Sequence, residues 1–119
     1  MHELAVCNSV LMQAERIAKD HDARAVECIR LAVGPLSGVE PHLLEMAFSV
    51  ARAGTLAADA TLLIESLPIR VRCRTCGAES TATPNRLCCA QCADWQTDLV
   101  SGDEMLLTSL ELVLEEENV

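Results

Sequence analysis

Aromatic residues are nearly absent from this sequence, which contains Phe48, Trp95 and no tyrosine. Proteins that bind single-stranded nucleic acid stack bases on several aromatic side chains, so this composition argues against such a platform. Basic residues are also scarce, because 9 Lys and Arg stand against 18 Asp and Glu and give a net charge of −9. Phosphates and anionic membranes repel an acidic protein. We therefore expect no nucleic acid and no membrane among its partners.

Long apolar runs are missing as well. No segment approaches the roughly 18 to 20 apolar residues that a membrane-spanning helix requires, and the first residues lack the charged and then apolar pattern of a signal peptide. These features predict a soluble, cytoplasmic protein. In that reducing compartment, paired cysteines hold metal or carry redox chemistry more often than they form disulfides.

Residue periodicity predicts two helices. Apolar residues recur every three or four positions over residues 3–19, which is typical of an amphipathic helix with one face on a core. Pro41 suits the first position of a second helix, with Glu40 at or just before its cap and Gly54 as its stop. We expect Leu44 and Phe48 on the buried face of this helix.

Alternating apolar residues predict three strands. The segment AVECIRLAVG (25–34) is the first, and TLLIESLPIRVRC (61–73) is the second, with a break at Pro68. The third lies in EMLLTSLELVLEEE (104–117), near the end of the chain. Two helices packed on one face of a small antiparallel sheet make an α+β fold.

The strongest chemical signal is the segment CRTCGAESTATPNRLCCAQC. Cys73 and Cys76 form one C-x-x-C pair, Cys89 and Cys92 form another, and twelve residues separate the pairs. Each pair can fold into a tight knuckle that points two thiolates at one ion, and the intervening residues can form a short hairpin. Four sulfur ligands with no open position are typical of structural zinc. Zinc binding of about 10 to 16 kcal/mol would stabilise an insert with almost no apolar core.

Three further cysteines, Cys7, Cys28 and Cys88, lie outside the two C-x-x-C pairs. Cys88 abuts Cys89, so it either packs as a spare thiol against the second knuckle or replaces Cys89 in a C-x-x-x-C pair with Cys92. Cys7 and Cys28 occupy periodic helix and strand positions. A free cysteine in such a position behaves as a small buried hydrophobe.

The opening MHELAV raises a second metal hypothesis. The α-amine of Met1, the amide nitrogen of His2 and the His2 imidazole can form fused chelate rings in one plane. This is the start of a square-planar site, a geometry that favours Ni(II) or Cu(II) over zinc. The fourth donor would come from Glu3, or from the loop that carries Glu40 and His42. The alternative is that His2 is a solvated chain end that binds nothing.

These features occur together in one family. The start MHELAV, the central VGPLSGVEPHLLEMAF, the paired-cysteine insert and the late GDEMLLTSLEL resemble the HypA/HybF family of hydrogenase maturation factors, which are nickel metallochaperones. The resemblance covers nearly the whole chain in the same order. It implies an α+β nickel-binding domain with an inserted four-cysteine, zinc-ribbon-like domain. We place the nickel-binding domain at residues 1–69 plus 102–119 and the zinc-binding domain at residues 70–101.

The resemblance also implies the ligands. The family's nickel ligand falls on His2, with the amine of Met1 and neighbouring amides as co-ligands. The Glu3 side chain helps to shape the site, and Glu40 matches an acidic position near nickel in some members. The zinc ligands fall on Cys73, Cys76, Cys89 and Cys92. The LCCAQC stretch departs from the family, which commonly has a single cysteine and often a proline in the second knuckle.

The implied function is that of a carrier and not of an enzyme. Nickel would be cargo, accepted at the amino terminus and delivered to the large subunit of a nickel-iron hydrogenase together with a GTPase accessory protein, while zinc stays structural. No nucleophile, base and orienting group can be assembled from the motifs. Exposed strand edges and the Met-containing helix would support a homodimer. The alternative function is a zinc-ribbon interaction or regulatory protein in which His2 binds no nickel.

Overall fold

The computed structural model describes residues 2–114, and of His2 it describes the backbone alone. Within this range the chain forms two helices and six strands in an α+β fold with small antiparallel sheets, as the sequence predicts. No helix in residues 2–114 is long and apolar enough to cross a membrane. The chain divides into two compact units: the first takes in the residues up to 31, 40–64 and those from 107 onward, and the second takes in 32–39 and 65–106. The domain boundaries at residues 70 and 101 stay a prediction.

Both helices belong to the first unit. Helix α1 spans His2–Asp20, and its predicted apolar stripe is buried at Cys7, Val10, Leu11, Ala14 and Ala18. Leu4, predicted on the same stripe, lies in the first turn and is exposed. Helix α2 spans Pro41–Ala51 and buries Leu44 and Phe48. Its N-cap is Glu40, so the predicted start is confirmed. It ends at Ala51, short of Gly54, because Arg52 forms the C-cap and donates its backbone N–H to the Phe48 carbonyl.

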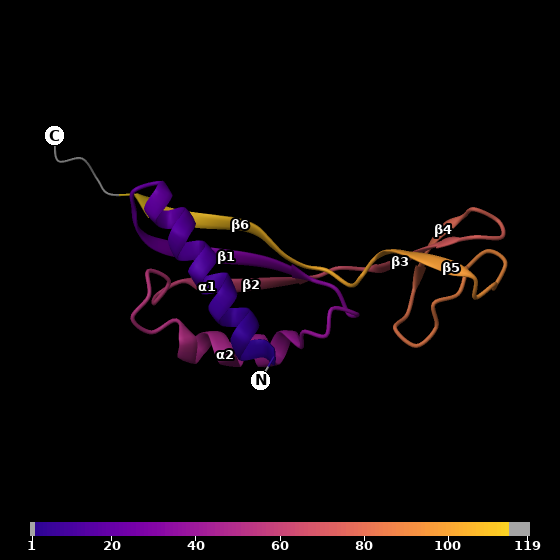
Figure 1. Ribbon diagram of the computed structural model, residues 1–119, viewed down its shortest axis with the longest axis horizontal. Helices are drawn as coiled ribbons and strands as arrows, with labels where there is room; N and C mark the ends of the chain where they lie inside the picture. Colours follow the sequence, from indigo (N-terminus) through magenta and orange to yellow (C-terminus); the bar gives the residue numbers. More distant parts are fainter. Residues whose placement is uncertain (1, 115–119) are drawn as a thin grey trace. The chain divides into compact units, whose positions relative to one another are not determined.

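Strands β1 (Ala23–Val33), β2 (Thr61–Ser66) and β6 (Met105–Leu114) form a sheet with the order β2-β1-β6. The central strand β1 is the most buried of the three, with Ile29 and Leu31 almost fully enclosed. In the first unit, α1 crosses this sheet and its amino end reaches the start of α2 (Figure 1). The amino ends of the two helices therefore lie side by side in the first unit.

The second unit is built on strands β3 (Ile69–Cys73), β4 (Glu79–Ala82) and β5 (Thr97–Ser101), in the antiparallel order β4-β3-β5. Ile69, Val71 and Cys73 alternate along β3 as its buried residues. The sequence predicted a short hairpin within residues 77–88, between the two cysteine pairs. The structure has only an isolated bridge there in place of a two-stranded hairpin. Strand β4 of this segment pairs with β3, and a single bridge between Thr83 and Arg86 closes the following turn.

Two connections of the second unit lie in close backbone contact. The amide of Gly34 donates a hydrogen bond to the Glu104 carbonyl at 2.8 Å, and the amide of Leu36 donates to the Gly102 carbonyl at 2.7 Å. A Cβ atom at Gly34 would lie 2.1 Å from that Gly102 oxygen. Glycine is therefore required at position 34 by the close approach of the second chain segment.

Candidate metal centres

Four cysteine sulfurs gather in the second unit. The Sγ atoms of Cys73, Cys76, Cys89 and Cys92 all lie within 4.8 Å of one another. The Cys73–Cys92 and Cys76–Cys89 sulfur pairs are each 3.6 Å apart. Thiolates at the corners of a tetrahedron around zinc, with Zn–S bonds of about 2.3 Å, would be about 3.8 Å apart. The four donors therefore fit one tetrahedral ion.

The two C-x-x-C knuckles share one backbone design. Four residues after the first cysteine of each pair, Gly77 (φ 76°) and Ala93 (φ 63°) adopt the left-handed conformation. Gly77 donates its amide hydrogen to the Cys73 carbonyl at 3.0 Å, and Ala93 donates to the Cys89 carbonyl at 2.9 Å. These turns bring the second cysteine of each pair back beside the first. Glycine adopts this conformation without strain, but an alanine carries no signal for a left-handed backbone.

Backbone amides stabilise two of the sulfurs as thiolates. The amide of Cys76 lies 3.4 Å from the Cys73 sulfur, and the amide of Cys92 lies 3.5 Å from the Cys89 sulfur. The Cys76 amide lowers the pKa of Cys73 to about 7, and the Cys92 amide lowers the pKa of Cys89. Metal binding requires deprotonated thiols, so Cys73 and Cys89 are the two sulfurs that lose their protons first. Hydrogen bonds with neighbouring sulfurs raise the pKa of Cys76 and of Cys92.

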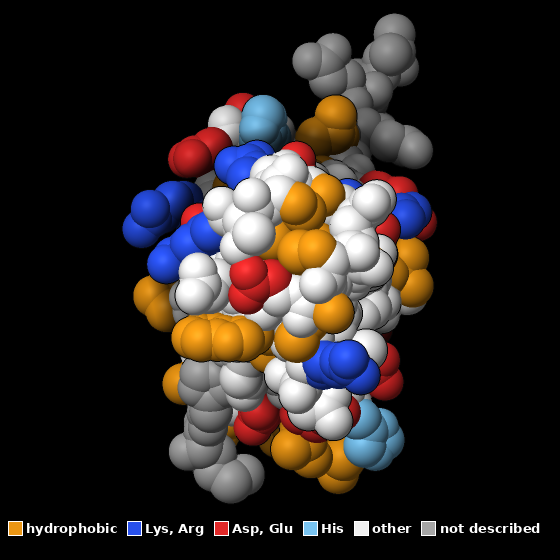
Figure 2. Space-filling view, turned by 90° about the vertical axis from the view of Figure 1, so that its right-hand side faces the viewer, with side chains coloured by type: hydrophobic (Ala, Val, Ile, Leu, Met, Phe, Trp, Pro, Cys, Tyr) orange, Lys and Arg blue, Asp and Glu red, His pale blue; other side chains and the backbone are white. Residues whose placement is uncertain are grey.

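Two arginines of the second unit form ion pairs with carboxylates. Arg72 pairs with Glu79 at 3.5 Å, and Arg74 pairs with Asp98 at 2.6 Å. These pairs are exposed, so they position side chains more than they stabilise the fold. On the face drawn in Figure 2, basic, acidic and apolar side chains are interspersed.

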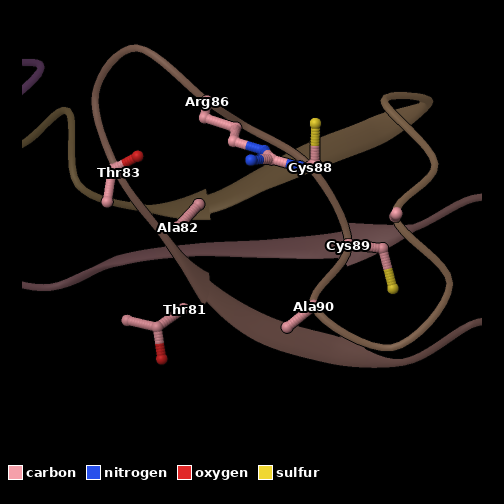
Figure 3. A pocket seen from close by; sticks show the side chains of 8 residues that line it. Thr81, Ala82, Thr83, Arg86, Cys88, Cys89 and Ala90 are labelled. Carbon is pink, nitrogen blue, oxygen red and sulfur yellow. The ribbon is translucent and has the colours of Figure 1, made fainter.

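The structure separates Cys88 from the four-sulfur cluster. Cys88 and Cys89 both line a pocket of about 410 Å³, but their side chains point in opposite directions (Figure 3). Among the described residues, the sulfur cluster includes Cys89 and not Cys88. The geometry therefore corresponds to the C-x-x-C register and not to the C-x-x-x-C alternative with Cys92.

A second candidate site lies at the amino end of α1, in the first unit. Met1 and the side chain of His2 lie outside the described structure. The helix begins at His2, and the first amides of a helix have no carbonyl acceptor within it. Coordination through the amide nitrogen of His2 would therefore break no hydrogen bond of the helical ladder.

The structure brings two predicted nickel-site residues together at this helix end. The Oε2 atom of Glu3 accepts a hydrogen bond from the backbone amide of Glu40 at 3.3 Å. The Oε1 atom of Glu40 accepts one from the amide of His42 at 3.4 Å. Two acidic residues thus lie together where both helices begin, and the positive end of each helix dipole stabilises negative charge there. His42, the tentative additional ligand, is exposed in the first turn of α2.

A four-sulfur site joined to an α+β unit defines a small metal-binding protein. The family described as hydrogenase/urease nickel incorporation, metallochaperone, HypA matches residues 1–112. This chain is 44% identical over 113 residues to hydrogenase maturation factor HypA of Nitrosospira multiformis, a match that covers 95% of this chain and 98% of that protein. It is 40% identical over 112 residues to HypA of Aquifex aeolicus, with 94% and 97% covered.

Solved structures agree with these sequence matches. The solution structure of the Ni metallochaperone HypA from Helicobacter pylori superimposes with a TM-score of 0.67 at 25% identity, and covers 95% of this chain and 98% of that one. A second HypA solution structure gives a TM-score of 0.73 at 27% identity, with 97% and 98% covered. The chain belongs to the HypA family of hydrogenase maturation factors. These are metallochaperones and not enzymes, as the sequence predicted.

Proposed function

We propose that this chain carries Ni(II) at its amino terminus and helps to insert it into the large subunit of nickel-iron hydrogenase. The observation that carries the proposal is the hydrogen bond from the Glu40 backbone amide to the Glu3 carboxylate, which places these two acidic residues together where α1 and α2 begin. A divalent cation bound by the first residues of the chain would lie in an acidic environment. The family description, nickel incorporation, names the same cargo.

The proposed nickel site is built on Met1 and His2. The α-amine of Met1, the amide nitrogen of His2 and the His2 imidazole supply three nitrogens in one plane, the geometry that suits Ni(II). Glu40 is the proposed fourth donor, while Glu3 holds the Glu40 backbone in place. Because the amide must lose its proton, nickel binding tightens as pH rises. Such an open site releases its ion by ligand exchange to a cysteine-rich acceptor.

Zinc is the proposed occupant of the four-cysteine site. Four thiolates at tetrahedral spacing suit zinc and leave no open coordination position for exchange. The coordination geometry of each site would therefore select its ion, with nickel at the amino terminus and zinc in the cysteine cluster. Zinc would supply much of the folding energy of the second unit, and the proposed domain division at residues 70–101 follows this separation of roles.

The proposed function also implies a cellular compartment and partner proteins. Insertion of nickel takes place in the cytoplasm, together with the GTPase accessory protein of hydrogenase maturation. The family description names urease beside hydrogenase as a nickel recipient. A homodimer formed through exposed strand edges is a further expectation, which sedimentation of the zinc-loaded protein would test.

The decisive experiment is a nickel titration of protein with an untagged amino terminus, combined with measurement of bound metal. We expect one tightly held zinc and one exchangeable nickel in the wild type. His2→Ala should lose the nickel and keep the zinc. The control is His21→Ala, which removes an imidazole just beyond the opposite end of α1, about 28 Å away along the helix, and should change neither metal. Equal nickel binding by His2→Ala and wild type would favour the zinc-ribbon interaction or regulatory protein.

A further inference from the structure

Helix α2 carries a second apolar face that the core does not use. Leu43, Met46 and Val50 are 46, 56 and 74% exposed. At about 100° per residue, these positions fall within about 60° of arc around the helix axis. The buried residues Leu44 and Phe48 lie on another side of the same helix. We call Leu43, Met46 and Val50 the α2 stripe.

An acidic groove of about 480 Å³ runs along one flank of the stripe. Glu45 and Ser49 contribute to it from α2, and Asp59 contributes from the loop before β2. Arg52 also lines the groove. Its guanidinium donates to the Ala60 carbonyl at 2.9 Å and lies 5.5 Å above the Phe48 ring.

The two carboxylates of this groove have no cationic partner. Neither Glu45 nor Asp59 forms an ion pair within residues 2–114. The groove lining carries two carboxylates against the single guanidinium of Arg52, so its net charge is negative. Together with the apolar α2 stripe, this charge fits a ligand that is apolar on one face and basic on its flank.

We propose that the α2 stripe and its acidic groove dock an amphipathic helix of a partner protein. The apolar face of that helix would cover Leu43, Met46 and Val50, and a Lys or Arg on its flank would reach Glu45 and Asp59. The proposal does not depend on nickel binding, since its five residues exclude all of the proposed nickel ligands.

The geometry of α2 selects a helix as the occupant. The backbone of α2 is hydrogen-bonded within the helix, so α2 offers no free edge on which a strand could pair. A partner therefore docks on its side chains. The stripe is about 10 Å long, or two helical turns, which matches the i, i+3 and i+7 anchors of helix recognition. A second copy of this chain is disfavoured because it would bring another charge of −9 against the same carboxylates.

The test uses the full, zinc-loaded chain and three labelled, stapled helical peptides. The first carries Leu at i, i+3 and i+7 with Lys on the flank, the second has Glu in place of Lys, and the third has Ser in place of Leu. Fluorescence anisotropy should show saturable binding of the first peptide. The other two should bind at least about tenfold more weakly, because each lacks one of the two matching features.

Variants of the protein locate the binding surface. Met46→Gln and Val50→Ser should each weaken the Lys peptide about tenfold. Met12→Gln is the matched control, because Met12 is 70% exposed on α1, and it should have no effect. Glu45→Lys should make the Glu peptide the tighter ligand. Non-specific adsorption to apolar surface cannot produce this reversal.

Three results would overturn the proposal. The first is equal binding of the Lys peptide by wild type and Met46→Gln, with circular dichroism showing that both are folded. The second is no binding of the Lys peptide at about 1 mM, where even a contact of about −4 kcal/mol would be half saturated. The third is a concentration-dependent dimer that Met46→Gln makes monomeric, which would identify a second copy of the chain as the occupant.

Discussion

The carboxylate of Glu3, in the first turn of α1, accepts a hydrogen bond from the backbone amide of Glu40, the N-cap of α2. The two residues are 37 positions apart in the sequence. Since Glu40 in turn caps α2 by accepting from the amide of His42, the Glu3 side chain joins the first turns of both helices. A substitution at Glu3 should therefore change the stability of the first unit as well as metal binding.

Glu3→Ala should lower the free energy of unfolding by about 1 kcal/mol, because the Glu40 amide loses its acceptor. It should also weaken nickel binding, since the proposed fourth donor is no longer held. Glu3→Gln keeps a side-chain oxygen as acceptor and should retain most of the stability. Thermal unfolding and nickel titration of the same samples test both effects.

The control for this prediction is Glu45→Ala, which removes an exposed carboxylate of α2 that accepts no hydrogen bond within residues 2–114. It should leave both unfolding and nickel affinity near wild type. If Glu3→Ala unfolds like wild type, the hydrogen bond contributes nothing and the link between the helix ends is of no consequence.

Ala93 offers a stabilising substitution. It occupies the left-handed position of the second knuckle, where Gly77 stands in the first. An L residue with a side chain pays about 1 kcal/mol or more for this conformation, so Ala93→Gly should raise the free energy of unfolding of the zinc-loaded protein by about 0.5 to 1 kcal/mol. Gly77→Ala should lower it by a similar amount. Chemical denaturation with matched zinc content measures both, and opposite signs to those expected would refute the shared design of the knuckles.

The sequence predicted the fold where periodicity was clear. The apolar spacing of residues 3–19 marked α1, and Pro41 with Glu40 marked the start of α2. Strands β4 and β5 were not predicted, because β4 is four residues long and the apolar residues Leu99 and Val100 of β5 are exposed. Their pairing with β3 depends on contacts between distant segments, which no local pattern encodes.

The cysteine site was easier to foresee than the carboxylate pair. C-x-x-C spacing predicted the four-sulfur site, because a knuckle is local in sequence, but the choice between Cys88 and Cys89 came from the structure. The contact between Glu3 and Glu40 depends on how α1 packs near α2, so the residues alone could not specify it. The hydrogen bond from the Thr75 hydroxyl to the Asp94 carboxylate, which joins the two knuckles, was missed for the same reason.

Substitution of single cysteines distinguishes the clustered cysteines from Cys88. Cys76→Ser removes one of the four converging sulfurs and should abolish tight zinc binding, with unfolding of the second unit, because the proposed zinc site would supply much of the stability of that unit. Cys88→Ser should retain zinc and thermal stability, since Cys88 lies outside the cluster. Zinc content and thermal unfolding are the measurements. Full zinc and an unchanged midpoint in Cys76→Ser would show that the cluster is not the zinc site.

Glu104 should make the stability of the protein depend on pH. Hydrogen bonds from its own amide and from the amide of Gly102 lower its pKa below the ordinary value of 4.5, and the Gly102 nitrogen lies 2.6 Å from its Oε1 atom. A carboxyl with a lowered pKa in the folded state contributes stability above the unfolded pKa. That contribution is lost as pH falls through the folded value.

Glu104→Gln should therefore be less stable than wild type at pH 7, and the difference should shrink as the pH falls below about 4.5. Zinc release in acid affects both proteins alike, so the difference between their unfolding midpoints isolates the carboxylate. Asp103→Asn is the control, because the Asp103 side chain accepts no hydrogen bond within the described range, and its difference from wild type should not follow this profile. A Glu104→Gln difference of the same size at pH 4 and pH 7 would mean that the ionised carboxylate does not hold this turn. The close approach of Gly34 and Gly102 would then rest on the backbone hydrogen bonds alone.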